Sequence, residues 1–86
     1  MNTVFALMAA YEAKQAVPLE TVHKDYFAHM LFPRFKADVM SGDIPLVTFT
    51  GTDSQKAQRM VAITDLAAFL DKRMAQARSD FKKLAG

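Results

Sequence analysis

Arg34 and Lys36 are the residues of this chain whose types and spacing best suit a defined chemistry. They come early in a segment with helical periodicity, where a helix lying in a DNA major groove would reach base edges. An arginine in that position can donate two hydrogen bonds to one guanine. The competing interpretation is a solvated helix face on which Asp38 supplies the counter-charge. If the helix binds DNA, Asp38 must point away from the phosphates or accept a hydrogen bond from a cytosine amine.

A second group of polar side chains lies at or near the tip of an expected hairpin. Its members are Ser54, Gln55, Lys56 and Arg59. Hydroxyl and amide groups donate hydrogen bonds to phosphate oxygens, and a lysine neutralises the phosphate charge. The competing interpretation is a long polar loop without a ligand. The sequence favours neither interpretation over the other.

The residue patterns that most enzymes and metal sites require are missing. The chain has no cysteine, which excludes disulfides, thiolate zinc sites and thiol nucleophiles. His23 and His29 lack the i, i+4 spacing of a helical metal pair. There is no nucleophile elbow, no glycine-rich phosphate loop and no pair of carboxylates on an apolar floor. We expect no enzyme, no metal, no cofactor and no small-molecule substrate; His29 is either a phosphate contact or a solvent-exposed turn residue.

Length and charge limit the possibilities further. The 86 residues suffice for one domain, and 51% of them are apolar, enough for a core without disulfides. The net charge of +2 is mild for a nucleic-acid-binding protein. Residues 1–16 are neutral, 17–44 carry −1, 45–63 carry +1 and 64–86 carry +2. DNA binding would therefore depend on a few well-placed cations.

The chain is expected to be a soluble intracellular protein of the cytoplasm. It contains no apolar run near the roughly 20 residues that span a bilayer. Its N-terminus lacks the basic start and small-residue cleavage site of a secretory signal. The absence of cysteine agrees with a reducing compartment.

The periodicity predicts a mainly helical domain with a small β-hairpin. A first helix runs from Thr3 to about Gln15, capped by Asn2 or Thr3. Helices over 18–26 and 32–41 follow, and Gly42 ends the second of them in the left-handed conformation. A two-stranded ribbon is expected near 46–63, and a last helix over 64–84 with Thr64 as its N-cap. Helix, turn, helix, wing and helix is the order of a single winged helix-turn-helix domain, with its helix-turn-helix at 18–41.

Each expected helix carries an apolar stripe that predicts the core. The expected core positions are Val4, Leu7, Met8, Tyr11, Leu19, Val22, Tyr26, Phe27, Phe32, Phe35, Val39, Met40, Met60, Leu66, Phe69 and Leu70. Arg73 and Ala77 continue the last stripe, with Arg73 at its edge. Phe81 and Leu84 follow on a largely charged helix end, a pattern that often marks packing against another element or subunit. Met30 and Met74 are candidates for an interface.

Several short segments occur in a characteristic order and spacing. They are Pro18-Leu19-Glu20, Asp25-Tyr26-Phe27, Gly42-Asp43-Ile44, Ser54-Gln55-Lys56 and Asp65-Leu66-Ala67, followed by Asp71 and Arg73. Through them the chain, from Met1 to about Arg73, resembles the pyocin activator protein (PrtN-type) family. A looser similarity extends to excisionase-like and MerR-like winged modules. The family resemblance implies sequence-specific binding to double-stranded promoter DNA and activation of phage-tail-like bacteriocin (pyocin) or prophage genes.

Two other functions stay open at this point. A phage-encoded inhibitor could keep the fold and bind a host protein, and the apolar wing strand Val47–Gly51 and the weak net charge favour it. An excisionase-like architectural factor would bend DNA instead. For the activator we expect a homodimer, joined through the last helix around Phe81, because one small module offers few phosphate contacts. RNA polymerase is a further expected partner, and no membrane is.

Overall fold

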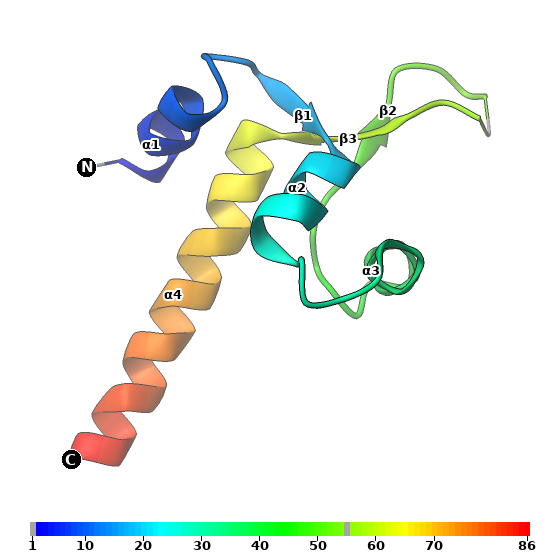
Figure 1. The fold of residues 1–86 in the computed structure, drawn as a ribbon. Helices are drawn as coiled ribbons and strands as arrows, with labels where there is room; N and C mark the ends of the chain where they lie inside the picture. Colours follow the sequence, from blue (N-terminus) through cyan, green and yellow to red (C-terminus); the bar gives the residue numbers. More distant parts are fainter. Residues whose placement is uncertain (1, 55) are drawn as a thin grey trace.

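A computed structural model describes residues 2–54 and 56–86 of the chain. Within them the architecture is mainly helical, as predicted, with four helices and three short strands in one small domain (Figure 1). In chain order the elements are α1 (Thr3–Ala10), β1 (Ala16–Pro18), α2 (Leu19–Tyr26), α3 (Phe32–Ser41), β2 (Phe49–Thr50), β3 (Arg59–Ala62) and α4 (Ile63–Ala85). Gln55, one of the predicted site residues, lies outside the described residues.

The strands form an antiparallel sheet in the order β1-β3-β2. In its register Val17 pairs with Val61, and Phe49 pairs with Met60. The expected ribbon had only two strands, so this prediction was wrong in one respect. The buried Val17 brings a third strand against β3, and the backbone of Ile63 extends this pairing by donating to the Gln15 carbonyl. A two-stranded hairpin is only marginally stable alone. The added strand stabilises this one by attaching it to the core.

Three predicted helix boundaries differ from the structure. The first helix stops at Ala10, because Glu12 and Ala13 adopt left-handed φ values of 59° and 61°. Pro18 is the N-cap of α2 and not a residue of its first turn. Thr64 is not the cap of α4, whose N-cap is Ala62. The chain passes directly from β3 into α4, and Ile63, the first residue of the helix, is buried in the core.

The core lies where α2, α3 and the first half of α4 meet β1 and β3. Its largest fully buried side chains are Phe35, Leu19, Ile63, Leu66, Val22 and Val61. Leu7 and Val39 are also buried, which confirms the predicted inward faces of α1 and α3. Two predicted core residues are exposed: Met40 at 52% and Tyr26 at 39%. Met40 is at the edge of the apolar stripe of α3, and Tyr26 is the last residue of α2.

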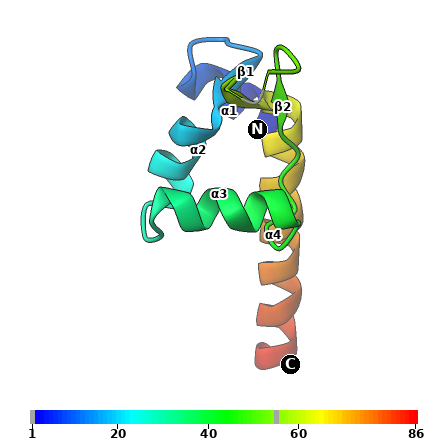
Figure 2. The same ribbon diagram turned by 90° about the vertical axis from the view of Figure 1, so that its right-hand side faces the viewer.

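The second half of α4 extends away from the rest of the domain (Figures 1 and 2). Every residue from 71 to 86 is exposed, whereas Leu66 and Ala67 in the first half are buried. The molecule therefore measures 50 × 28 × 20 Å. None of the helices among the described residues is long and apolar enough to cross a membrane.

Candidate nucleic-acid interface

The position of α3 is fixed by its buried face and by its two ends. Phe35 and Val39 are buried against the core. Pro33 occupies the first turn of the helix, where its missing N–H costs nothing. Gly42 ends the helix with a φ of 87°, the left-handed conformation predicted from the sequence. The opposite face of α3 is consequently free to meet a ligand.

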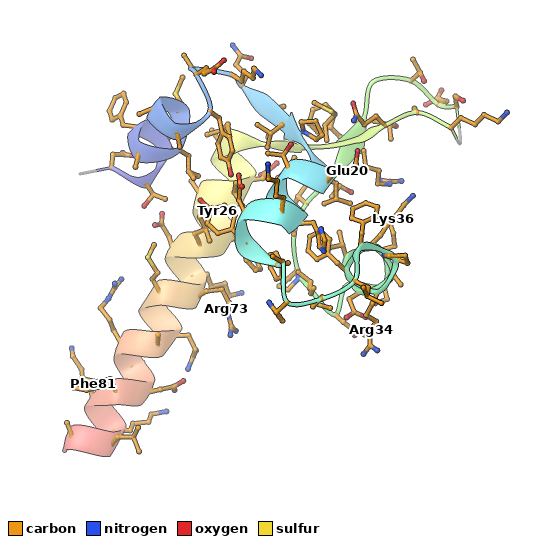
Figure 3. All side chains as sticks on the ribbon, in the orientation of Figure 1. Glu20, Tyr26, Arg34, Lys36, Arg73 and Phe81 are labelled. Carbon is orange, nitrogen blue, oxygen red and sulfur yellow. The ribbon has the colours of Figure 1, made fainter. Side chains whose placement is uncertain are left out.

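Arg34 and Lys36 are exposed at opposite edges of this free face (Figure 3). Residues two apart on an α-helix are separated by about 200° of rotation. Arg34 and Lys36 therefore cannot reach one base pair together, although they can contact groups on the two sides of a groove. Between them lie Pro33, Ala37, Met40 and Ser41, all exposed, and of these four Ser41 alone has a polar side-chain group.

Arg34 is paired with Asp38, the counter-charge that the sequence suggested. The guanidinium Nε donates to the two carboxylate oxygens at 3.1 and 3.2 Å. The Arg34 side chain is 73% exposed, so the pair contributes only about 0.3–0.5 kcal/mol. Among the described residues, the two terminal guanidinium nitrogens of Arg34 have no hydrogen-bond partner, which leaves them available to a ligand.

The tip of the hairpin is organised by short-range hydrogen bonds. Thr50 donates its hydroxyl to the Thr52 carbonyl at 2.7 Å, and the Lys56 N–H donates to the Ser54 hydroxyl oxygen at 3.2 Å. Ser54 thus shapes the loop, while its hydroxyl hydrogen can still be donated. Lys56 is exposed. The ion pair found in the described part of the chain joins Arg34 and Asp38 and does not involve Lys56.

Arg59 lies at the stem of the hairpin, where it pairs with Thr50, and not at the tip. Its Nη1 donates to the Thr48 hydroxyl at 2.9 Å, and the side chain is half-buried. Nearby, the Gln58 amide donates to the Glu20 carboxylate at 3.1 Å and joins the hairpin to α2. Sequence reasoning missed both contacts, since no spacing rule brings these residues together.

The turn between α2 and α3 is held by His23, which the sequence left without a role. The ring Nε2 donates to the Met30 carbonyl oxygen at 2.6 Å. The imidazole also lies 5.4 Å from the Phe32 ring and 5.5 Å from the Phe35 ring, measured between centroids. His29 is exposed in the same turn. Within the described residues, no three histidine or acidic side chains gather as a metal site would require.

Seen along the direction of Figure 2, α3 lies across the front of the molecule, the hairpin is above it, and α4 is behind. The helix carrying Arg34 and Lys36 and the hairpin carrying Lys56 are thus on one side of the molecule. Exposed apolar side chains also lie around α3 and the hairpin. These are Leu31 at 80%, Val47 at 59%, Met40 at 52% and Phe49 at 42%.

Comparison with known proteins gives one family. A family model described as pyocin activator protein PrtN matches residues 3–77. The matched region runs from the first residue of α1 to the middle of α4 and contains both α3 and the hairpin. No curated protein and no solved structure matches the chain significantly.

Proposed function

The chain belongs to the pyocin activator protein PrtN family, and we propose that it is a winged helix-turn-helix protein. In this proposal it binds promoter DNA sequence-specifically and activates pyocin or prophage genes. The family is a regulatory activator family and not an enzymatic one. The work of such a protein belongs in the cytoplasm, where promoter DNA and RNA polymerase are found. RNA polymerase is accordingly a second partner in the proposal.

The proposal rests mainly on one observation: α3 and the hairpin lie on the same side of the molecule (Figure 2). An α-helix with its side chains is about 10–12 Å across and fits the roughly 12 Å width of the major groove. With α3 in the groove as recognition helix, the hairpin would reach the neighbouring phosphate backbone as a wing. The ring of His23 supports this by fixing the turn that sets the angle between α2 and α3.

Each cation has a separate part in this proposal. Arg34 offers its two free guanidinium nitrogens to the guanine edge, the commonest base-specific contact. Lys36, on the other edge of α3, contacts a base or the opposite backbone. Lys56, with Ser54 and Gln55, holds the phosphates from the wing. Arg59 is already bound to Thr48, so it supports the stem and adds positive potential.

Two substitutions separate base reading from phosphate binding. Arg34→Ala should relax the preference for the selected site over a scrambled site, by a factor of about 5–100. Lys56→Ala should weaken binding to both DNAs equally and lower the salt slope by about one. Fluorescence anisotropy with the two duplexes at several salt concentrations measures both effects.

Lys14→Ala is the matched control for these variants. Lys14 is exposed in the turn between α1 and β1, so its loss removes one positive charge away from the proposed interface. We expect its DNA affinity to match that of the wild-type protein. If Arg34→Ala and Lys56→Ala also bind like wild type, the residue assignment is wrong.

A second function, binding of a protein partner, is favoured by the apolar side chains Leu31, Met40, Val47 and Phe49 around α3 and the hairpin. Such a contact would be driven by apolar burial and would respond little to salt. DNA binding through about four phosphates would instead weaken about 100-fold between 50 and 200 mM salt. The salt series therefore distinguishes the two functions.

A further inference from the structure

The exposed half of α4 carries an apolar stripe with a regular repeat. Leu70, Met74, Ala77, Phe81 and Leu84 follow one another at intervals of four, three, four and three residues. This is the heptad spacing of a coiled-coil seam, in which Met74 and Phe81 take a positions and the others take d positions. Met74 is 43% exposed, Phe81 69% and Leu84 88%.

The stripe begins inside the domain and continues past its end. Ala67, the preceding a position, is buried, and Leu70 is half-buried against the core. Past Arg73 the helix extends away from the domain (Figure 3), and residues 71–86 are all exposed, so the described residues leave this part of the stripe uncovered. An apolar groove lies there, lined by Ala77, Arg78, Phe81 and Lys82. A contiguous exposed apolar seam of this kind marks an interaction site.

We propose that a second copy of this chain covers the stripe, with its α4 packed antiparallel to the first. In the register that we propose, Met74 faces Ala77 of the second copy and Leu70 faces Phe81. The two-fold axis then passes between residues 75 and 76. Each contact occurs twice, as the symmetry of a homodimer requires.

Charges on both sides of the seam select this arrangement. Asp71 and Arg78 occupy e positions, and Arg73 and Asp80 occupy g positions. In an antiparallel pair, e positions face e positions and g positions face g positions. Asp71 therefore faces Arg78 of the second copy, and Arg73 faces Asp80. The Asp71 carboxylate also accepts a hydrogen bond from Thr3, and its second oxygen remains for the arginine.

Other arrangements bring like charges together. A parallel pair places Arg73 opposite Arg78 of the second copy, because g positions then face e positions. An antiparallel pair shifted by one heptad toward the C-terminus places Arg78 opposite Arg78 and Asp80 opposite Asp80. The proposed register is the one of these three in which the four charges form only opposite pairs. The stripe belongs to α4 and not to α3 or the hairpin, so its pairing does not depend on the proposed DNA binding.

The oligomeric state of the full chain without DNA tests the proposal. Sedimentation equilibrium should show a monomer–dimer equilibrium, and a monomer at all concentrations up to about 200 µM would overturn it. Phe81→Glu should abolish the dimer and retain the folded domain, because Phe81 is exposed there. Ser79→Glu is the control: it adds the same charge on the far side of α4 and should dimerise like wild type.

A charge exchange tests the register. Asp80→Arg should raise the dimer dissociation constant about tenfold or more, because it places two arginines together. Adding Arg73→Asp to the same chain should restore the dimer, since the pair is then reversed. If Asp80→Arg dimerises like wild type, the antiparallel register is wrong.

Introduced cysteines give an independent measurement, because the chain has none of its own. In the proposed register, a mixture of Met74→Cys and Ala77→Cys chains forms a disulfide-linked heterodimer on oxidation. Efficient cross-linking of Ala77→Cys chains to one another would instead indicate the parallel pair and overturn the register.

Discussion

Arg34 and Asp38 lie one turn apart on α3, and their ion pair places a negative charge on the face proposed to meet DNA. The Asp38 side chain is 19% exposed, so it affects the local potential while Arg34 extends beyond it. The sequence allowed two roles for Asp38, a counter-charge or an acceptor from cytosine. The structure shows the counter-charge in the free protein, and the contact is weak enough to be exchanged when a base takes its place.

Replacing this carboxylate should strengthen DNA binding. Asp38→Asn removes one negative charge near the phosphates and releases the Arg34 guanidinium, so we expect affinity to rise about 3- to 10-fold at low salt. Glu12→Gln, in the turn after α1, removes the same charge away from α3 and should leave affinity unchanged. Fluorescence anisotropy measures both variants. Weaker binding of Asp38→Asn to the selected site would mean that Asp38 itself reads a base.

Tyr11 connects α1 to α2, because its hydroxyl donates to the Asp25 carboxylate at 2.7 Å. Burial, together with this hydrogen bond, raises the pKa of the Tyr11 hydroxyl well above its ordinary value of about 10. The folded state then keeps a proton that the unfolded chain loses. The stability from this group is present below pH 10 and decreases as the pH rises above 10.

Tyr11→Phe should therefore destabilise the protein by about 0.5–1.5 kcal/mol at pH 7. The difference from wild type should become smaller at pH 11, since the wild-type protein has lost part of its advantage there. Urea unfolding at the two pH values measures this change. A difference that stays constant between pH 7 and pH 11 would contradict the account of Tyr11.

At the scale of elements, the sequence predicted those segments best whose ends are marked by particular residues. Pro33 and Gly42 bracket α3, and its observed range of 32–41 agrees with the predicted one. The end of α1 was wrong by several residues, because Glu12 and Ala13 adopt the left-handed conformation without a glycine to signal it. The three-residue strand β1 was missed because its partner β3 lies more than forty residues later.

The same distinction applies to the candidate site. Exposure of Arg34, Lys36 and Lys56 follows from helical periodicity and from a polar hairpin tip, so the sequence predicted it. The contacts of Arg59 with Thr48 and of His23 with Met30 depend on how the hairpin and the turn fold back. Such contacts leave no periodic pattern in the sequence, so they could not be predicted from it.

The turn after α1 gives a prediction about backbone strain. Ala13 has a φ of 61°, a conformation that costs a non-glycine residue about 1–2 kcal/mol. Ala13→Gly should remove that cost, offset in part by the greater entropy of the unfolded chain, and raise the melting temperature by about 2–6 °C. Ala6→Gly, inside α1, should lower it, because glycine is unfavourable in a helix. A lower melting temperature for Ala13→Gly would contradict the assigned strain.

At the scale of the whole molecule, the elongated shape separates two surfaces. One contains α3 and the hairpin, and the other is the free half of α4 (Figures 1 and 2). In the proposed dimer, the two-fold axis passes between residues 75 and 76 of α4, about ten residues along the helix from Leu66. The two Leu66 residues are then about 30 Å apart along the helix axis, at 1.5 Å per residue. A dimer of this kind would bind two half-sites, which are 34–36 Å apart when they lie one DNA turn apart.

Sequence-specific DNA binding is tested by selection of bound sequences from a random pool of double-stranded DNA at near-physiological salt. We expect enrichment of one motif that contains a guanine contacted by Arg34. With the dimer formed, the motif should occur as an inverted repeat about one helical turn apart. A single motif without a repeat would retain DNA recognition and contradict the dimer. Recovery of unsorted DNA, or of none, would contradict sequence-specific binding and favour the protein-binding function.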